Sequence, residues 1–352
     1  MIGNEALQRL APIRLEGAGR SVVIDPPVIL APMSGVSDLP FRRLAHEQGA
    51  GLVVSEMIAS WAMIRENQRT LSMAGIAAGG PNAIQLAGCE PAAMAEAARM
   101  AEDRGADLID INFGCPVKKV ALGQQAGSAL MRDEQGAAKL LEAVVGAVAV
   151  PVTLKMRLGW DHASLNAPTI AKLAENAGIR MVSVHGRTRQ QFYTGHADWT
   201  LIRRVKEVVR IPVIVNGDML EEADVTTALT ASGADGVMIG RGACGRPWFL
   251  GQVGEFLKSG RRIEDPALEQ QKGIALGHFR AMLSHYGLAA GVRIARKHLG
   301  WYARGLPGAA AFRGSVTRLE EPDEVEQQLA AFLDPLIARG IARLAEPVAL
   351  AA

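Results

Sequence analysis

The sequence predicts an α/β fold, a (β/α)8 barrel (TIM barrel), followed by a C-terminal all-helical domain. Three observations lead to this prediction. Short apolar runs recur through the first two-thirds of the 352-residue chain. Amphipathic helical stretches separate these runs, and both patterns stop near Gly260.

The apolar runs have the length and composition of buried strands. They show no alternation of apolar and polar residues, which is typical of parallel strands covered on both faces. Their starts are far enough apart to leave room for a crossover helix each time. The eight runs are residues 28–31, 52–54, 83–86, 108–111, 152–155, 181–184, 213–215 and 237–239.

The stretches between the runs predict helices. Residues 91–104, 165–176 and 221–232 are amphipathic, and each stretch ends shortly before a glycine, a common helix stop. Eight strand–helix units in about 240 residues are what a (β/α)8 barrel requires. A doubly wound open sheet is the alternative, and eight regular units disfavour it.

The last quarter of the chain has no buried strand pattern and is punctuated by glycine and proline. We therefore predict a barrel domain over residues 1–261 and a helical domain over residues 262–345. The helices expected in the second domain are residues 266–287, 288–304 and 322–339.

Charge is distributed unevenly, although the formal net charge is only +2. Residues 1–260 hold 26 basic and 26 acidic side chains, residues 261–318 hold 10 and 3, and residues 319–352 hold 2 and 7. The surplus of basic residues in the middle block predicts a localised site for a polyanion. A solvated helical surface with uneven charge explains the same counts.

The three cysteines, Cys89, Cys115 and Cys244, lie far apart, so we expect a reducing compartment, no disulfide framework and no metal site. No apolar run approaches the roughly 18–20 residues of a membrane span, and the first 20 residues lack the apolar core of a signal peptide. We expect a cytoplasmic protein without a membrane partner or an obligate protein partner.

Polar residues follow almost every predicted strand, at the end where such barrels carry their chemistry. Lys155 and His185 end two strands and Gln85 lies in a third. Directed into one mouth, the three would suit a flavin, whose pyrimidine ring carries carbonyl groups and becomes anionic on reduction. The alternative for Lys155 and His185 is a side chain that reaches solvent beyond the rim.

The last two strands end in glycine-containing turns, VNGDM (215–219) and IGRGA (239–243). Glycine lets backbone N–H groups approach a phosphate, and barrels commonly bind phosphate after these two strands. Either glycine alone is explained by an ordinary turn, but the pair at these two strands favours a phosphate-bearing cofactor.

Cys115 lies in the turn NFGCP (112–116), just after the fourth strand. A single cysteine is usually a small buried apolar residue, and we interpret Cys89 and Cys244 in that way. At Cys115, the flanking Gly114 and Pro116 force a turn at the rim, where a thiol can act as a proton donor or a nucleophile. Both interpretations of Cys115 remain open on the residues alone.

Taken together, these residues resemble the tRNA-dihydrouridine synthase family, over nearly the full chain. The C-terminal segment RKHLGWYARGLPGAAAFR (296–313) is similar to its bacterial B-type branch. The matching barrel motifs are LAPMSGVSDLPFR (30–42), SEM (55–57), QLAG (85–88), DINFGCPVKKV (110–120), GSALMRD (127–133), TLKMRLGW (153–160), VHGRTRQQFYTGHADW (184–199), VNGDM (215–219) and GVMIGRGACGRPWF (236–249).

The resemblance implies an FMN-dependent enzyme that reduces a tRNA uridine to 5,6-dihydrouridine, with NADPH as the reductant. Cys115 would be the catalytic acid that protonates C5 after hydride passes from flavin N5 to C6. Asn112 would bind the target uracil, which the B-type branch takes from the D-loop at position 17. The residues implied to hold FMN are Pro32, Met33, Gln85, Lys155, His185, Asn216, Gly217, Asp218, Gly240 and Arg241.

A base that reacts deep in a barrel must leave its stack, so a second surface must hold the tRNA body. Our candidates for phosphate contacts are basic residues of the helical domain, and basic residues of barrel loops are expected to guide the flipped nucleotide. The first group is Arg293, Arg296, Lys297, His298, Arg304 and Arg313, and the second is Lys118, Lys119, Arg187 and Arg189.

Two other functions are consistent with parts of this pattern. A flavin barrel that acts on a small molecule would share the phosphate turns and Lys155, but it needs neither the basic helical region nor the NFGCP turn. An RNA-binding protein that retains the barrel only as a scaffold would have no need of Asn112, Cys115, Lys155 and His185 together.

Overall fold

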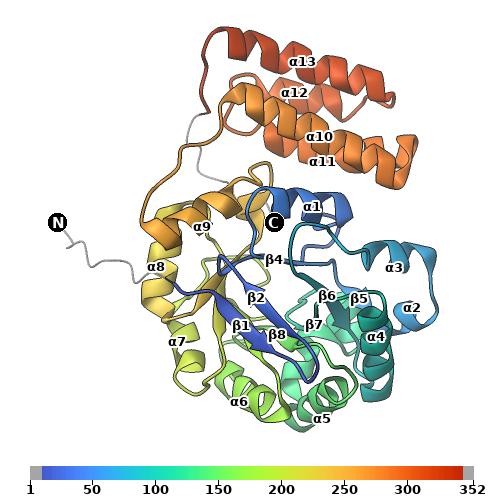
Figure 1. Ribbon diagram of the computed structural model, residues 1–352, viewed down its shortest axis with the longest axis vertical. Coiled ribbons are helices and arrows are strands. Elements are labelled where there is room, and N and C mark those ends of the chain that lie inside the picture. The colour runs from blue at the N-terminus through green and yellow to red at the C-terminus, as the bar shows by residue number, and fades with distance from the viewer. Residues whose placement is uncertain (1–9, 344–352) are drawn as a thin grey trace, which may run out of the picture.

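The computed structural model describes residues 10–343, and in them eight parallel strands close into a barrel (Figure 1). The strands are β3 (Val28–Leu30), β4 (Leu52–Val54), β6 (Asn82–Ala87), β7 (Leu108–Phe113), β8 (Val152–Arg157), β9 (Met181–His185), β10 (Val213–Asn216) and β11 (Gly236–Ile239). Their order is β4-β3-β11-β10-β9-β8-β7-β6, and pairing of β4 with β6 closes the ring. All eight predicted strands are present, and the barrel fold is confirmed.

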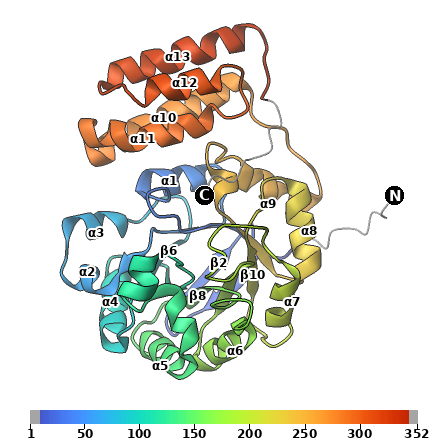
Figure 2. The same ribbon diagram turned by 180° about the vertical axis from the view of Figure 1, so that it is seen from behind.

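Helices surround the strands as an outer layer (Figure 2). The predicted helices at 91–104, 165–176 and 221–232 are α4, α6 and α8. Alanines of α4 are buried, as the narrow space between a helix and a sheet requires. The helices are α1 (Leu39–Glu47), α2 (Ser60–Ile64), α3 (Gln68–Met73), α4 (Pro91–Asp103), α5 (Glu134–Val145), α6 (Ala167–Ala177), α7 (Thr200–Lys206), α8 (Glu222–Ser232) and α9 (Phe249–Ser259).

A two-stranded antiparallel hairpin, β1 (Ile13–Glu16) and β2 (Ser21–Ile24), precedes the barrel and was not predicted. Its apolar side chains, including Leu15 and Ile24, pack with Leu108 and Met181 at the amino-terminal ends of barrel strands. The hairpin therefore closes one end of the barrel, and the carboxyl end is left for the site.

Several short elements follow barrel strands and also lie outside the predictions. Strand β5 (Ile58–Ala59) pairs with β6. The π-helical turn η1 (Lys119–Gly123) and the 3-10 helix η2 (Gly127–Arg132) fill the connection between β7 and α5. A further 3-10 turn, η3 (Arg241–Ala243), follows β11.

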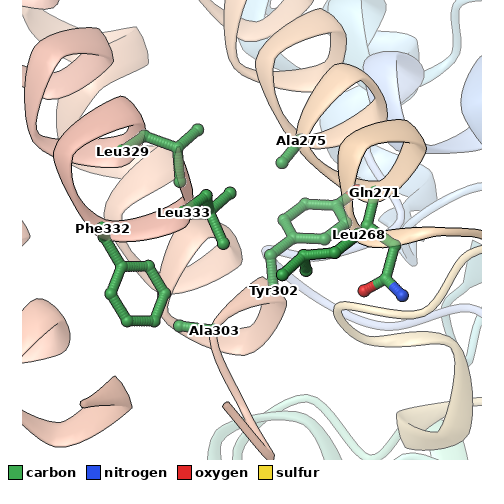
Figure 3. Close-up of a pocket in the computed structure, with 8 residues that line it drawn as sticks. All are labelled: Leu268, Gln271, Ala275, Tyr302, Ala303, Leu329, Phe332 and Leu333. Carbon is green, nitrogen blue, oxygen red and sulfur yellow. The ribbon is translucent and has the colours of Figure 1, made fainter. Parts of the chain in front are cut away.

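Four helices form the described part of the C-terminal region: α10 (Leu268–Tyr286), α11 (Leu288–Tyr302), α12 (Ala309–Val316) and α13 (Pro322–Ala338). Leu268, Tyr302 and Leu333 belong to their shared apolar core, which Figure 3 shows. Helices α10, α11 and α13 match predicted helices, and α12 was missed. The predicted division at residue 261 stays a prediction, and residues 344 and 345 of the predicted helical domain lie outside the described part.

The C-terminal helices lie against α1 and the loop before it (Figure 1). The Tyr286 hydroxyl donates to Asp38 Oδ2 at 3.0 Å, and Lys297 Nζ donates to the carbonyl oxygen of Gly35. The ring of Phe41 packs against that of His298, with centroids 5.8 Å apart. Within residues 10–343, no helix combines the length and the apolar character that a membrane crossing requires.

Candidate functional site

A cavity of about 360 Å³ opens at the carboxyl ends of the barrel strands. Volumes of this order are typical of cofactor and ligand sites. Its lining includes Cys115, Asn112 and every residue that the sequence assigned to the cofactor: Pro32, Met33, Gln85, Lys155, His185, Asn216, Gly217, Asp218, Gly240 and Arg241. Strand register explains the convergence, because Asn112 lies beside Lys155 on neighbouring strands, and His185 lies beside Asn216.

Hydrogen bonds between β6 and β7 fix the floor of the cavity. The Asp110 carboxylate accepts from Gln85 Nε2 at 2.7 Å. In turn Gln85 Oε1 accepts from Asn112 Nδ2, also at 2.7 Å. Burial raises the pKa of Asp110, which the hydrogen bonds from Gln85 and Thr153 oppose. Asp110 was not among the predicted site residues, and it acts here by orienting two amides that are.

The Cys115 turn is held by its own neighbours. Asn112 Oδ1 accepts from the backbone N–H groups of Gly114 and Cys115, at 3.0 and 2.8 Å. Ser128 Oγ donates to the Cys115 carbonyl at 2.8 Å. Arg157 Nε donates to the Gly114 carbonyl at 2.9 Å. Burial raises the pKa of the Cys115 thiol, so the sulfur keeps its proton at neutral pH.

Two basic groups face the cavity from β8 and β9. Lys155 Nζ donates to Asn216 Oδ1 at 3.0 Å. Burial, and then the nearby Arg157, lowers the pKa of Lys155 to about 8. Burial and four neighbouring cations lower the pKa of His185 well below its usual value, so the imidazole is neutral at pH 7. A lysine ammonium has three N–H donors, and only one of them meets a protein acceptor within the described residues.

The turn after β10 has backbone conformations that residues other than glycine rarely adopt. Gly217 has φ +120°, and a Cβ atom there would come within 2.8 Å of the His185 ring. Asp218 also has positive φ, at 55°. Its carboxylate accepts from Arg187 at 2.6 Å and from Arg241 at 3.1 Å. The half-buried Arg241 guanidinium, beside a glycine backbone open to close approach, gives this end of the cavity the character of an anion site.

These features fit FMN. Lys155 offers two free N–H donors to a carbonyl or an anionic ring, and burial makes an unshared ammonium costly without such a partner. Met33 and Met238 line the cavity with flat, adaptable apolar surface. The glycine turn and Arg241 lie at the position where barrels commonly hold a phosphate.

The predicted nucleotide-guiding residues of the barrel are not equivalent. Lys118 and Lys119 are exposed, just beyond the Cys115 turn. Arg187 is fully buried, and its guanidinium donates to Asp218 and to the carbonyls of Thr194 and Gly195. Arg187 therefore holds its own loop, and a nucleotide contact would require this ion pair to open.

Two predicted phosphate contacts on α11 are occupied by the protein itself. His298 is buried, with its ring 4.9 Å from that of His278, so it presents no charge to solvent. Arg296 is half-buried and donates to the Leu319 carbonyl.

The other predicted phosphate contacts of the helical region are more accessible. Arg293 on α11 and Arg313 on α12 are exposed, and Arg304 is half-buried. Lys297 is exposed while it also donates to Gly35, so it retains donors for a second partner. None of these residues lines the cavity, which agrees with a role in holding a large substrate outside it.

Several lining residues were not predicted for the site, and two of them are aromatic. Tyr193, on the loop after β9, is 43% exposed, with the guanidinium groups of Arg157 and Arg241 5.5 and 5.2 Å from its ring centre. Trp301 comes from α11 of the helical region. The sequence shows these aromatic residues, in QQFYTG and HLGWYA. Hydrophobic periodicity, however, cannot predict that a loop or a distant helix will lie over the mouth of the barrel.

Comparison with known proteins identifies a family. The family model described as dihydrouridine synthase matches residues 29–336. A probable tRNA-dihydrouridine synthase of Rickettsia bellii is 55% identical over 314 residues, which cover 89% of this chain and 96% of the relative. The tRNA-dihydrouridine synthase B of Xanthomonas axonopodis pv. citri is 50% identical over 319 residues, which cover 90% of this chain and 95% of the relative.

A solved structure shows the same fold at low sequence identity. It is a 2-naphthoyl-CoA reductase in complex with 2-naphthoyl-CoA, with a TM-score of 0.55 and 12% identity. The match covers 70% of this chain and 52% of the reductase chain. At that identity the likeness concerns the fold alone.

Proposed function

Because the chain belongs to the dihydrouridine synthase family, we propose that it binds FMN and reduces a uridine of tRNA to 5,6-dihydrouridine, with NADPH as the reductant. One observation carries the proposal: the predicted acid, the predicted uracil ligand and all ten predicted cofactor residues line a single cavity. Strand register brings these positions together in any such barrel, and the proposal depends on their being a thiol, an amide, a lysine and a histidine at once.

The protein's own groups supply proton transfer and electrostatics. Bound FMN would supply the hydride that reduces C6 of the uracil. Cys115 Sγ holds a proton at neutral pH and would give it to C5, and positioned acid catalysis of this kind contributes about 10²–10⁴ in rate. The Lys155 ammonium and the neutral His185 imidazole would stabilise negative charge on the pyrimidine end of the cofactor.

Asn112 serves the same reaction in two ways. Its Oδ1 already orients the Cys115 turn, and one hydrogen of Nδ2 is free to bond a uracil carbonyl. Because the cavity lies at the barrel mouth, the uridine must flip out of its stack, and the exposed cations of the helical region would hold the tRNA body. Similarity to the B-type relatives leads us to propose a D-loop uridine, position 17.

The direct test uses tRNA from a strain that lacks dihydrouridine. The tRNA is incubated with the protein, FMN and NADPH, and dihydrouridine is quantified by nucleoside mass spectrometry and mapped by position. We expect product at one D-loop position. Flavin-bound protein that oxidises NADPH in air yet leaves the tRNA unchanged would overturn the proposal in favour of a small-molecule flavoenzyme. Protein that binds tRNA but no flavin would indicate the scaffold function.

A further inference from the structure

Two arginines share one indole ring at the rim of the barrel. The guanidinium carbon of Arg132 lies 4.7 Å from the centre of the Trp160 ring, and that of Arg189 lies 4.6 Å from the same centre. The Arg189 guanidinium is also 5.3 Å from the centre of the Phe192 ring. Cation–π contacts of this kind hold a guanidinium in place without neutralising it.

Neither arginine has a counter-ion among the described residues. Within residues 10–343, no salt bridge or side-chain hydrogen bond involves Arg132 or Arg189. Nε and Nη2 of Arg189 are buried without a hydrogen-bond partner. By contrast, Arg187, two residues away, is fully engaged by Asp218. Two unpaired guanidinium groups on one ring repel each other, so an anion beside them would stabilise the arrangement.

The three residues lie on three successive loops at the functional end of the barrel. Arg132 follows β7, Trp160 follows β8 and Arg189 follows β9. Backbone hydrogen bonds join the last two loops, from Arg189 N to the Gly159 carbonyl and from Gln190 N to the Trp160 carbonyl, each at 2.9 Å. Arg132, Trp160 and Arg189, which we call the stack, are therefore part of the rim of the barrel mouth.

Hydrogen bonds that hold the Cys115 turn also connect it to the loops that carry Arg132 and Arg189. Helix η2 begins beside Ser128, which bonds the Cys115 carbonyl, and it ends at Arg132. Its five residue steps span about 10 Å, at about 2 Å per residue in a 3-10 helix. Arg157 joins the Gly114 carbonyl to the carbonyl of Phe192, in the loop that carries Arg189. The loops that carry Arg132 and Arg189 are thus hydrogen-bonded, directly or through Arg157, to the Cys115 turn.

We propose that Arg132 and Arg189, held on Trp160, form a phosphate-binding subsite for the tRNA backbone beside the flipped uridine. The inference rests on the proposed function, since it requires a flipped nucleotide near Cys115. It adds Arg132 and Trp160 to the substrate contacts, and it separates Arg189, which is half-buried and has no ion pair within the described residues, from Arg187, which is fully buried and paired with Asp218.

The test is equilibrium binding of an unmodified tRNA transcript to the holoenzyme as a function of salt concentration. We expect Arg132→Gln with Arg189→Gln to weaken binding by about tenfold or more, as loss of charge-assisted hydrogen bonds does. The slope of log K against log salt should fall by roughly 1.5, since each lost phosphate contact contributes about 0.7–0.9. Arg132→Gln alone should lower the salt slope by about half as much. Because Arg132 is exposed, this substitution is not expected to disturb folding, so a loss of binding would reflect the lost charge.

Arg180→Gln is the matched control. Arg180 is exposed, has no side-chain partner within the described residues, and precedes β9, whereas Arg189 follows the same strand at the other end of the barrel. It should leave the affinity nearly unchanged. Trp160→Leu, which keeps both charges but removes the ring, should weaken binding at an almost unchanged salt slope.

The outcomes are separable. If the wild-type holoenzyme fails to bind the transcript, the proposed function fails first. If the wild type binds and the arginine variants match Arg180→Gln in affinity and slope, the subsite is wrong. If the variants instead lose affinity for 2′,5′-ADP while tRNA binding stays unchanged, the stack serves a dinucleotide phosphate and our assignment to tRNA is overturned.

Discussion

Cys115 combines two properties that a proton donor needs. Burial raises the pKa of its thiol, and hydrogen bonds with Asn112 and Ser128 fix the turn that presents it. An activated nucleophile would require the opposite shift, toward the thiolate. The environment therefore favours the acid among the two roles that the sequence left open.

Replacement of Cys115 tests that role. Cys115→Ala should lower the rate of dihydrouridine formation by about 10²–10⁴, the usual contribution of a positioned acid, and leave flavin and tRNA affinity near those of the wild type. Single-turnover assays with FMN-loaded, NADPH-reduced protein measure the loss directly. Cys89→Ala is the control, because Cys89 is exposed and does not line the cavity. Equal rates for the two variants would show that Cys115 is not the proton donor.

Lys155 predicts a pH dependence. Its pKa is lowered to about 8, so the ammonium is present below pH 8 and is lost above it. FMN affinity should therefore fall as the pH rises through about 8, because the free protein then offers the cofactor a neutral amine. The free energy of unfolding depends on pH in the opposite direction. Between pH 8 and about 10.5 the unfolded chain binds more protons at this site than the folded chain does, so the Lys155 contribution to stability rises with pH in that window.

Titration of FMN binding by flavin fluorescence, from pH 6.5 to 9.5, measures the first effect. Lys155→Met should bind FMN weakly at every pH and lose the pH dependence. Lys155→Met that binds FMN as tightly as the wild type, with the same pH profile, would show that the ammonium does not contact the cofactor.

The predicted site residues that line the cavity share one property: each lies at or near the end of a strand. Chain order and strand register together place such residues in one mouth, so the strand pattern alone was enough to predict that Lys155 and Asn216 share a cavity. The identity of a residue says less about its exposure. Arg187 and His298 are titratable residues that are nevertheless buried. Arg187 bonds Asp218 and His298 packs against His278, and in each case the partner comes from another element of the chain.

At the scale of elements, the loops after β9 and β10 depend on one buried ion pair. Arg187 Nη1 and Nη2 meet the two oxygens of Asp218 at 2.9 and 2.6 Å, and the arginine also holds the Gly195 carbonyl. Because the pair ties one loop to the other, it also fixes Tyr193, which lines the cavity.

Removal of one partner should be costly. Arg187→Ala leaves a mostly buried Asp218 carboxylate with only the more exposed Arg241 as an ion-pair partner, and we expect a loss of about 3–5 kcal/mol in the free energy of unfolding. Denaturant unfolding measures it, with Arg204→Ala on the outer face of α7 as a control expected within about 0.5 kcal/mol. A loss below about 1 kcal/mol for Arg187→Ala would contradict a structural role and return Arg187 to the candidates for nucleotide contact.

The elements that were predicted are those with a strong internal period. Each barrel strand is a continuous apolar run, and α4, with Pro91 at its start and buried alanines, is readable without its neighbours. The hairpin β1–β2 alternates buried and exposed residues over only four positions in each strand, which is too short a pattern to stand out. Helix α12 has only eight residues and follows a turn with two glycines, and packing of Phe312 against Phe332 of α13 stabilises it.

At the scale of the molecule, the barrel and the C-terminal helices meet at the loop that carries part of the site. Pro32 and Met33 line the cavity, and Gly35 follows two residues later. The Gly35 N–H donates to Glu56 Oε1, and its carbonyl accepts from Lys297 of α11. Both sides of one glycine thus tie the loop that carries Pro32 and Met33, the proposed cofactor loop, to two separate parts of the fold. Lys297, predicted as a phosphate contact, is in place to position this loop.

Substitutions at two residues of α11 distinguish a loop-positioning role from a phosphate contact. Lys297→Met should weaken FMN binding, because the loop loses a tether, whereas Arg293→Met should leave FMN binding unchanged, since Arg293 is exposed and has no side-chain partner within residues 10–343. For tRNA the order should reverse, with the salt slope falling by about 0.7–0.9 for Arg293→Met and by less for Lys297→Met. Flavin fluorescence titration and salt-dependent tRNA binding give the two readouts on the same protein samples. If Lys297→Met changes the tRNA slope as much as Arg293→Met does and leaves FMN affinity intact, Lys297 is a phosphate contact and the helical region holds tRNA without coupling to the cofactor loop.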